Sequence, residues 1–434
     1  MIVPRYYEDL SILHENTMPN RSYYIPASKR MDNLVDDRAA SDRFQLLSGD
    51  WKFKFYDSIY DLKDAFFTAD YDVSDFDTIP VPSNWQMHGY DLHHYINSRY
   101  PFPADPPYVP HDNPCGTYVT KFQYQKDLSA PLTFLNFEGV DSCFYVWLNG
   151  KYVGYSQVAH STSEFDVTDH LCDGENTLAV LVLKWCDGSY LECQDKFRWS
   201  GIFRDVYLLN RPSNMLWDYF ITSKLGQGSA AVTVRTKTLP EDAFVRVSLY
   251  DPCGNLIATG KAEEYDDDHF SQAVSLNVAD PMLWNAEQPN LYTVVLETEG
   301  ETIVDYVGLR EICVKDSVVY LNGALIKFRG VNRHESDPVK GYVIDLEQTK
   351  RELKLLKEYN FNGIRTSHYP SHPLFYYLCD RYGFYVIDEA DIEAHGAEHC
   401  WHDGKLSNNK KWNVMVADDP DFIGSIVDRV QRMV

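Results

Sequence analysis

The fold is decided by the segment Gly330-Val-Asn-Arg-His-Glu335, together with Arg365-Thr-Ser-His-Tyr-Pro370 and Asp388-Glu-Ala-Asp-Ile-Glu-Ala-His-Gly396. Each segment ends or follows a short apolar run that is typical of a strand, and helix patterns lie between the segments. Strands that alternate with helices predict β/α units with parallel strands. Because functional side chains gather at the carboxyl ends of such strands, we expect the three segments to face one mouth.

The limits of these units follow from caps and apolar periodicity. Asp345 is placed to cap the first helix, and Gly383 is placed to end the second. Asp419-Pro420 opens a third helix on which Ile423, Val427, Val430 and Met433 share one face. The predicted strands are 326–331, 363–365 and 384–387, and the predicted helices are 345–360 and 371–382.

The chain before residue 314 is β-rich. Alternating residues on both sides of Asn149-Gly150 predict a hairpin with a type I′ turn, and Thr177 to Trp185 is typical of a buried strand. We therefore predict an antiparallel sandwich, and a second, immunoglobulin-like sandwich where the period of two continues. Polar residues with no apolar period precede both and are expected to form a docking arm. The predicted parts are an arm (1–40), two sandwiches (41–212 and 213–313) and β/α units (314–434).

Composition narrows the class of partner. The 434 residues include 40 Lys and Arg against 64 Asp and Glu, a net charge of −24, which disfavours nucleic acid and anionic membrane surfaces and favours a neutral or cationic ligand. The nine scattered cysteines form no Cys-x-x-Cys pair, which indicates reduced thiols and a cytoplasmic location. Charges at Arg5, Glu8 and Asp9 argue against a secretory signal, and no apolar run is long enough to span a membrane.

Two groups of residues could bind metal. Glu393 and His395 offer a hard oxygen and an imidazole two residues apart, which could reach one ion from an extended loop. A simple hydrogen-bonded loop explains the same pair. The spacing of His399, Cys400, His402 and Asp403 matches no zinc pattern, so these are interpreted as loop residues.

Three further motifs point to a family. They are Pro82-Ser-Asn-Trp-Gln-Met-His-Gly-Tyr-Asp91, Cys186-Asp-Gly-Ser-Tyr-Leu-Glu-Cys-Gln-Asp195 and Trp199-Ser-Gly-Ile-Phe-Arg204. With the three strand-end segments in order behind them, the chain resembles the cytoplasmic β-galactosidases of glycoside hydrolase family 2. The resemblance implies a multidomain β plus α/β chain: a jelly-roll sugar-binding-like sandwich, an immunoglobulin-like sandwich, and the first three β/α units of a (β/α)₈ TIM barrel.

The resemblance also implies an activity and a site. Family members hydrolyse terminal β-D-galactosides such as lactose with retention, and transfer galactose to other sugars. By motif, His334 and His368 would bind galactosyl hydroxyls. Glu393 and His395 would hold Mg²⁺. From the first sandwich, Asn97 and Asp187 would reach the substrate, and Asp187 would also ligate Na⁺; otherwise each is an ordinary turn residue.

The resemblance places both catalytic glutamates, the acid/base and the nucleophile, beyond Val434. Glu335, Asp388 and Glu389 match supporting positions. The acid/base glutamate would also be the third protein ligand of Mg²⁺, so both metal sites are expected to be incomplete here. Residues 314–434 cannot close a barrel of about 250 residues. We therefore expect this portion alone to be inactive, to need the rest of the barrel as a continuation or separate subunit, and to associate into oligomers.

Two alternatives remain at this stage. The two sandwiches could form a non-catalytic carbohydrate-binding or assembly module. The chain could also be a family 2 β-glucuronidase or β-mannosidase, although the motifs show none of the added basic residues that a glucuronate carboxylate would require.

Overall fold

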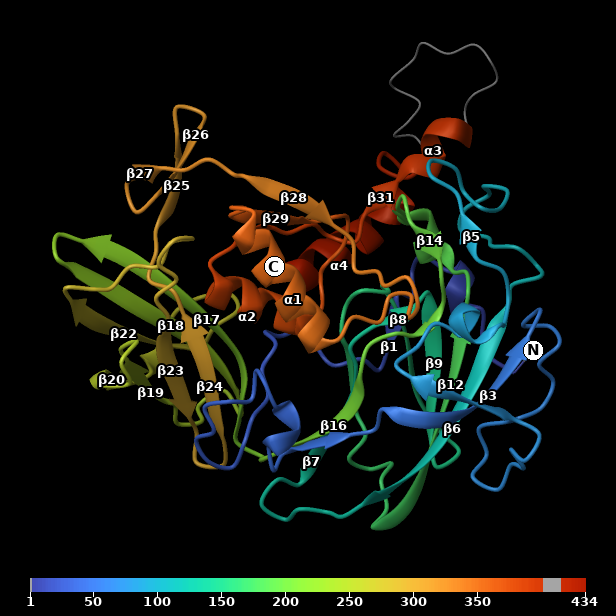
Figure 1. Ribbon diagram of the computed structural model, residues 1–434. Coiled ribbons are helices and arrows are strands. Elements are labelled where there is room, and N and C mark those ends of the chain that lie inside the picture. Colours follow the sequence, from blue (N-terminus) through green and yellow to red (C-terminus); the bar gives the residue numbers. More distant parts are fainter. Residues whose placement is uncertain (1, 401–414) are drawn as a thin grey trace.

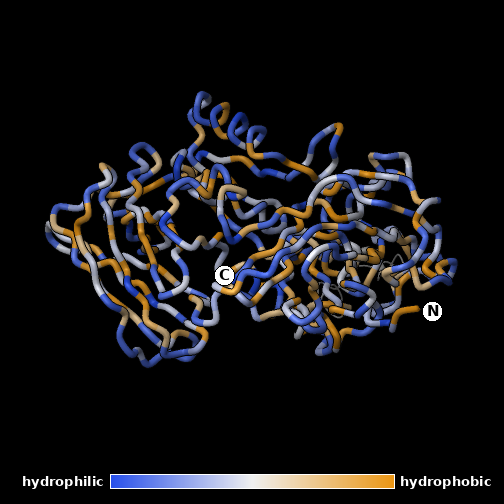
Figure 2. Tube along the Cα trace, turned by 90° about the horizontal axis from the view of Figure 1, so that it is seen from below, coloured by the Kyte–Doolittle hydropathy of each residue, from blue (hydrophilic) through white to orange (hydrophobic). Residues whose placement is uncertain are grey.

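The computed structural model describes residues 2–400 and 415–434. Figure 1 shows two β-rich lobes, with the first β/α units of a barrel above and between them. Figure 2, a view from below, shows the same two lobes at either side, with hydrophilic and hydrophobic residues alternating along many strands. This alternation is what two packed sheets with one face toward solvent require.

The first lobe is a jelly-roll sandwich of two antiparallel sheets, with its core between them. Asn149 and Gly150 both have positive φ, 54° and 77°, which confirms the predicted hairpin turn. In spatial order the large sheet is β1 (His14–Glu15), β10 (Lys151–Gln157), β9 (Cys143–Leu148), β12 (Gly174–Leu183), β6 (Cys115–Tyr124), β3 (Gly49–Tyr56) and β4 (Asp77–Val81). The small sheet is β11 (Ser163–Asp166), β7 (Leu132–Phe137), β16 (Val206–Arg211) and β2 (Phe44–Leu46).

Short elements join the strands of this lobe and carry its signature motifs. The 3₁₀ turns are η1 (Tyr6–Glu8), η2 (Arg38–Ala40), η3 (Trp85–His88) and η4 (Asp187–Tyr190). The short paired strands are β5 (His94–Tyr95) with β14 (Phe197–Arg198), and β8 (Val140–Asp141) with β15 (Gly201–Ile202).

The N-terminal arm is part of both sandwiches. Its strand β1 pairs with β10 in the large jelly-roll sheet. Farther along, Ile25 and Ala27 pack against Tyr207 and Leu209, and Ala27 also forms a bridge to Thr302 of the second sandwich. The segment therefore docks as expected, and it ties the two lobes together.

The second lobe is the immunoglobulin-like sandwich of two four-stranded antiparallel sheets. Valines and leucines of facing strands, among them Val232, Val247 and Val294, fill its core. One sheet is β17 (Met215–Gly226), β18 (Ser229–Leu239), β22 (Gln272–Ala279) and β21 (Glu263–Glu264). The other is β20 (Leu256–Lys261), β19 (Arg246–Tyr250), β23 (Tyr292–Glu297) and β24 (Thr302–Val307).

The barrel portion contains the predicted alternation. After a small sheet of β25 (Ile312–Lys315), β26 (Val318–Leu321) and β27 (Ala324–Leu325), three parallel strands β28 (Gly330–Arg333), β29 (Gly363–Thr366) and β30 (Tyr385–Ile387) alternate with α1 (Leu346–Glu358) and α2 (Pro373–Tyr382). The caps are as predicted: Asp345 accepts from the Gln348 amide at 2.7 Å, and Gly383 has φ +74°. The first strand is shifted from the predicted 326–331, because residues 330–333 are the ones that pair with β29.

The end of the described chain corrects one prediction. His399 and Cys400 belong to α3 (His395–Cys400), which follows β31 (Glu393–Ala394), whereas His402 and Asp403 lie outside the described residues. The last helix, α4 (Ile423–Met433), follows η5 (Pro420–Phe422).

The apolar face of α4 is exposed. Ile423 and Val427 are 55% and 46% exposed, whereas Arg429 is 1% exposed. The reason is that Arg429 pairs with Glu192 of the jelly roll at 2.8 Å, so the polar face of the helix is the docked one.

Within the described residues, no helix is long and apolar enough to cross a membrane. Eight of the nine cysteines, Cys115, Cys143, Cys172, Cys186, Cys193, Cys253, Cys313 and Cys379, are free thiols in the structure.

Candidate functional site

The carboxyl ends of the parallel strands bring two predicted site residues together. His334 directly follows β28 and His368 lies two residues after β29. Because adjacent parallel strands end at the same edge, the two imidazole rings lie 5.8 Å apart, with an interplanar angle of 76°. Both residues are partly buried, so part of each side chain is exposed at the mouth of the barrel portion.

The residues around His368 fix its orientation. Its Nδ1 lies 2.8 Å from a Glu389 carboxylate oxygen, and Arg365 contacts the other oxygen of that carboxylate. The Glu389 amide in turn donates to the Thr366 hydroxyl at 3.1 Å. Glu389 therefore orients the His368 ring.

Glu393 and His395, the predicted magnesium ligands, are adjacent. One Glu393 oxygen lies 2.8 Å from His395 Nδ1, and the other lies 3.7 Å from His368 Nε2. That second oxygen is buried and accepts no hydrogen bond, which fits an acceptor available to a cation. The described residues contain no group of three or more His, Cys, Asp or Glu arranged to hold a metal, so this pair is at most part of a site.

The jelly roll reaches the mouth through a parallel pairing that joins the two domains. Strand β13 (Glu192–Cys193) pairs with β31, and the Glu393 amide donates to the Leu191 carbonyl at 2.6 Å. Figure 1 shows β5, β14, β31 and α3 gathered at one end of this lobe. The loop that carries Asp187 is thereby fixed next to the barrel segment that carries Glu393.

Asp187 is an isolated buried carboxylate. It is fully buried, and neither of its oxygens has a hydrogen-bond partner of ordinary geometry. Burial raises its pKa to about 7, against the opposing effects of the Gln157 amide and the Arg429 charge. An unpaired buried carboxylate is costly, and a bound monovalent cation such as Na⁺ would satisfy it.

Asn97 lies in the loop after β5 and its side chain is exposed. The loop itself is close to the site, because the ring of Tyr100 lies against Gly396, where an added Cβ would be only 2.5 Å from ring carbons. The structure thus brings the Asn97 segment to the mouth but leaves the Asn97 side chain in solvent.

Behind His334, a buried ion pair joins the two domains. A Glu335 oxygen lies 2.9 Å from Arg204 and the other lies 3.3 Å from Arg333, and Arg204 also donates to the Pro370 carbonyl at 3.0 Å. Burial alone would raise the pKa of Glu335, but the two guanidinium groups hold it at about 2. Glu335 is therefore an anion near neutral pH, and it anchors the first strand end.

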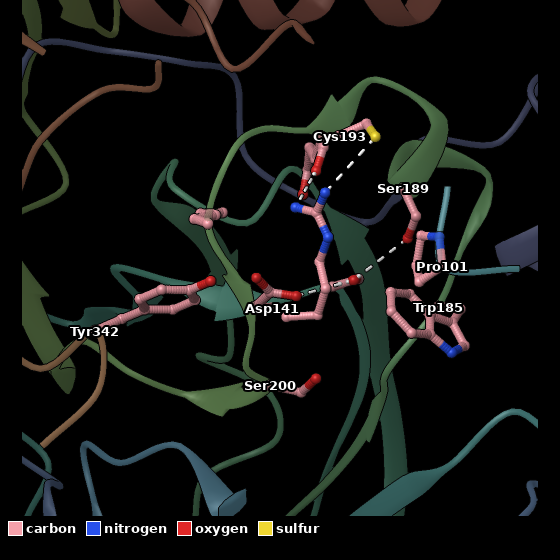
Figure 3. A pocket seen from close by; sticks show the side chains of 11 residues that line it. Pro101, Asp141, Trp185, Ser189, Cys193, Ser200 and Tyr342 are labelled. Atoms are coloured by element: carbon pink, nitrogen blue, oxygen red, sulfur yellow. Dashed lines mark hydrogen bonds between the residues drawn. The ribbon is translucent and has the colours of Figure 1, made fainter. Parts of the chain in front are cut away.

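Two cavities flank this region. A small one of about 20 Å³, room for roughly one water, lies beside the loop that carries Asp187 (Figure 3). Asp141, Ser189 and Tyr342 are among its lining residues. A larger cavity of about 350 Å³ lies between residues 35–39, α1, α2 and the jelly roll, and neither His334 nor His368 lines it.

Comparison with known proteins agrees with this architecture. The models described as "Glycosyl hydrolases family 2, sugar binding domain", "Glycosyl hydrolases family 2" and "Glycosyl hydrolases family 2, TIM barrel domain" match residues 44–212, 215–310 and 312–434. The chain belongs to glycosyl hydrolase family 2. The matches confirm the predicted fold class and the family resemblance.

Relatives and solved structures extend the comparison. The chain is 45% identical to a beta-galactosidase of Actinobacillus pleuropneumoniae and 40% identical to one of Staphylococcus xylosus, in both cases over 100% of this chain. It covers only 44% and 42% of those proteins, so it spans less than half the length of these relatives. A Bifidobacterium dentium beta-glucuronidase structure matches with a TM-score of 0.70 and 22% identity, covering 83% of this chain and 65% of its own. At that identity the likeness shows the fold alone.

Three residues beside the site received no role from the sequence. His160 and Lys196 look ordinary in their local sequence, whereas Tyr369 lies within the strand-end segment 365–370. In the structure they pack together behind His334, with the His160 ring stacked 3.8 Å from the Tyr369 ring. Only a measure of contact between distant segments could have found them.

Proposed function

We propose that this chain forms the substrate-positioning part of a β-galactosidase that hydrolyses terminal β-D-galactosides, such as lactose, with retention. The observation that carries the proposal is that His334 and His368 meet at one mouth in a chain whose whole length is 40–45% identical to curated proteins named beta-galactosidase. A neutral galactoside also suits a protein of net charge −24.

The residues of this chain would bind and orient the sugar. His334 and His368 would contact galactosyl hydroxyls, because imidazole nitrogens can donate or accept there according to their tautomer. Hydrogen bonds of this kind strengthen in the oxocarbenium-like transition state of glycoside hydrolysis, and that strengthening increases kcat. Asn97 would reach the sugar by a movement of its exposed loop.

We further propose partial metal sites. The free Glu393 oxygen and His395 would contribute to a Mg²⁺ site, and Asp187 would contribute to a Na⁺ site. When bound, such cations would neutralise carboxylates at the mouth and supply positive charge for polarising substrate oxygens.

The retaining reaction needs two carboxyl groups about 5–5.5 Å apart. We place both on polypeptide that follows the third β/α unit. Apolar side chains in this part of the chain lie open to solvent, as at Val314, Ile387 and Val427, which are 71%, 46% and 46% exposed. Further barrel units, as a continuation or a separate subunit, would cover such surfaces. Oligomer formation and a cytoplasmic location remain predictions.

The test is hydrolysis of nitrophenyl β-galactoside by the 434-residue chain alone, and after it is mixed with a C-terminal polypeptide that completes the barrel. We expect no activity from the chain alone and activity after mixing. Nitrophenyl β-glucuronide and β-mannoside serve as parallel substrates. Hydrolysis of one of these in preference to the galactoside would refute the substrate class, and no activity in any mixture would favour a non-catalytic carbohydrate-binding module.

A further inference from the structure

The hydroxyl of Tyr369 is a buried link between the main chain and His334. The Glu335 amide donates to this hydroxyl at 3.1 Å, and His334 Nδ1 lies 3.3 Å from it. Tyr369 is only 1% exposed, so water does not compete for either contact. Within the described residues, His334 Nδ1 is the only hydrogen-bond acceptor in contact with that hydroxyl.

The jelly roll fixes the ring of Tyr369. The His160 imidazole stacks on it with a centroid distance of 3.8 Å and an interplanar angle of 15°. The Lys196 ammonium lies 4.5 Å from the ring centroid, in cation–π contact. His160 is held in turn, because its Nδ1 lies 2.8 Å from Asp391 and its Nε2 accepts from Lys196 at 3.1 Å. Tyr369 therefore has little freedom to move its hydroxyl.

These contacts allow one arrangement of protons. The Tyr369 oxygen accepts the Glu335 N–H, so its own proton must be donated, and His334 Nδ1 is where it can go. With a proton on His334 Nδ1, the Tyr369 oxygen would have to accept from both N–H groups, and its own buried proton would be left without an acceptor, which is costly. The nitrogen that carries the ring proton is set by the partner of the other nitrogen.

We propose that Tyr369 is a positioning residue that fixes His334 as the neutral tautomer protonated on Nε2, so that His334 is a hydrogen-bond donor at the mouth. This inference deepens the proposed function and rests on it for the identity of the acceptor, a hydroxyl oxygen of a galactoside. Burial, together with the Lys196 charge, lowers the pKa of His334, which supports the neutral form at pH 7.

The neighbouring ring marks the place that this donor faces. His368 lies 5.8 Å from His334, and its Nδ1 and Nε2 face the carboxylates of Glu389 and Glu393 at 2.8 and 3.7 Å. A galactosyl hydroxyl oxygen at this mouth would accept a hydrogen bond from His334 Nε2.

The test measures the tautomer directly. The 434-residue chain is labelled with ¹⁵N in histidine only, and the imidazole nitrogens are observed by long-range ¹H–¹⁵N correlation at pH 7. The His334 signals among the 14 histidines are identified by their loss in His334→Gln. We expect Nε2 protonated in more than about tenfold excess over Nδ1. An Nδ1-protonated or doubly protonated ring in the wild-type chain would overturn the proposal.

The role of Tyr369 is tested by Tyr369→Phe, which keeps the ring that stacks on His160 and removes only the hydroxyl. The matched control is Tyr342→Phe, because the Tyr342 ring also lies 4.4 Å from Lys196 but its hydroxyl donates to the Phe197 carbonyl. We expect the His334 tautomer ratio to fall toward unity in Tyr369→Phe and to stay unchanged in Tyr342→Phe. An unchanged ratio in both variants would remove Tyr369 from this role. If Tyr369→Phe failed to fold, the wild-type measurement would still decide the tautomer.

A ligand titration separates this inference from the proposed function. Addition of isopropyl β-D-thiogalactoside, a non-hydrolysable galactoside, to the labelled chain mixed with the C-terminal polypeptide that completes the barrel should shift the His334 Nε2 resonance while Nδ1 stays unprotonated. If the tautomer is as expected but saturating thiogalactoside shifts no His334 signal, the donor has no galactoside to bind and the substrate assignment of His334 is refuted.

Discussion

The ion pair of Arg204 and Glu335 should stabilise the mouth of the barrel portion against local unfolding. The two side chains are 3% and 4% exposed, and their closest atoms are 2.9 Å apart. In Arg204→Met the chain would keep most of the side-chain volume, but Arg333, at 3.3 Å, would be the remaining ion-pair partner of Glu335, beside the His372 amide that donates to it at 3.0 Å. An uncompensated buried carboxylate is strongly destabilising.

The size of the effect follows from the pKa of Glu335. Its depression from 4.5 to about 2 corresponds to about 3 kcal/mol of interaction with the charged form. Removal of one partner of a buried ion pair typically costs about 3–5 kcal/mol, so we expect a loss of about 3 kcal/mol in the local free energy of opening. Hydrogen–deuterium exchange of peptides within 330–372 should then be faster by on the order of 100-fold at pH 7.

The control is Arg246→Met, which breaks an exposed pair with Glu297, 55% and 29% exposed at 3.0 Å. Pairs of that kind contribute about 0–1 kcal/mol, so exchange near Arg246 should change by less than about fivefold.

The stabilisation that the Glu335 ion pair provides decreases at acid pH. Because the folded pKa of Glu335 lies below its ordinary value of 4.5, the stabilisation is fully present above about pH 4.5. It is lost as the pH falls from about 4.5 toward 2, so the difference between wild type and Arg204→Met should shrink there. An Arg204→Met effect no larger than that of Arg246→Met at pH 7 would contradict the reasoning.

Three more predictions follow from the structure. Burial raises the pKa of the Asp305 carboxyl to about 6, although the Tyr219 hydroxyl donates to it at 2.8 Å. The free energy that Asp305 contributes to folding therefore falls as the pH rises from about 4 to 6. Asp305→Asn should remove that part of the pH dependence of Tm, and an unchanged slope of Tm against pH would contradict this prediction. Gly383→Ala should lower the free energy of unfolding by about 1 kcal/mol more than Gly254→Ala. Both glycines have positive φ, but only at Gly383 would an added Cβ meet a carbonyl oxygen, that of Ala286, at 2.5 Å. Equal shifts of Tm in the two variants would exclude that clash. In the complete enzyme, Asp187→Asn or His368→Ala should lower kcat/KM for nitrophenyl β-galactoside by on the order of 10², and near-normal kinetics would reject those site assignments.

The sequence alone determined the elements and much of the residue chemistry. Local signals are strong where one residue has a special backbone role, as with the Asn149-Gly150 turn, the Asp345 cap and the Gly383 end. The motifs also named His334 and His368, because residues at the ends of neighbouring parallel strands must meet.

Only the tertiary structure decided how the jelly roll completes the mouth. The pairing of β13 with β31, the docking of α4 by Arg429 and the stacking of His160 on Tyr369 each join segments that are far apart in the chain. The free energies of these contacts come from burial and charge pairing between domains, which no local sequence pattern indicates. The orientation of α4 is decided in the same way: the ion pair of Arg429 with Glu192, a residue outside the helix, docks the polar face and leaves Ile423 and Val427 exposed.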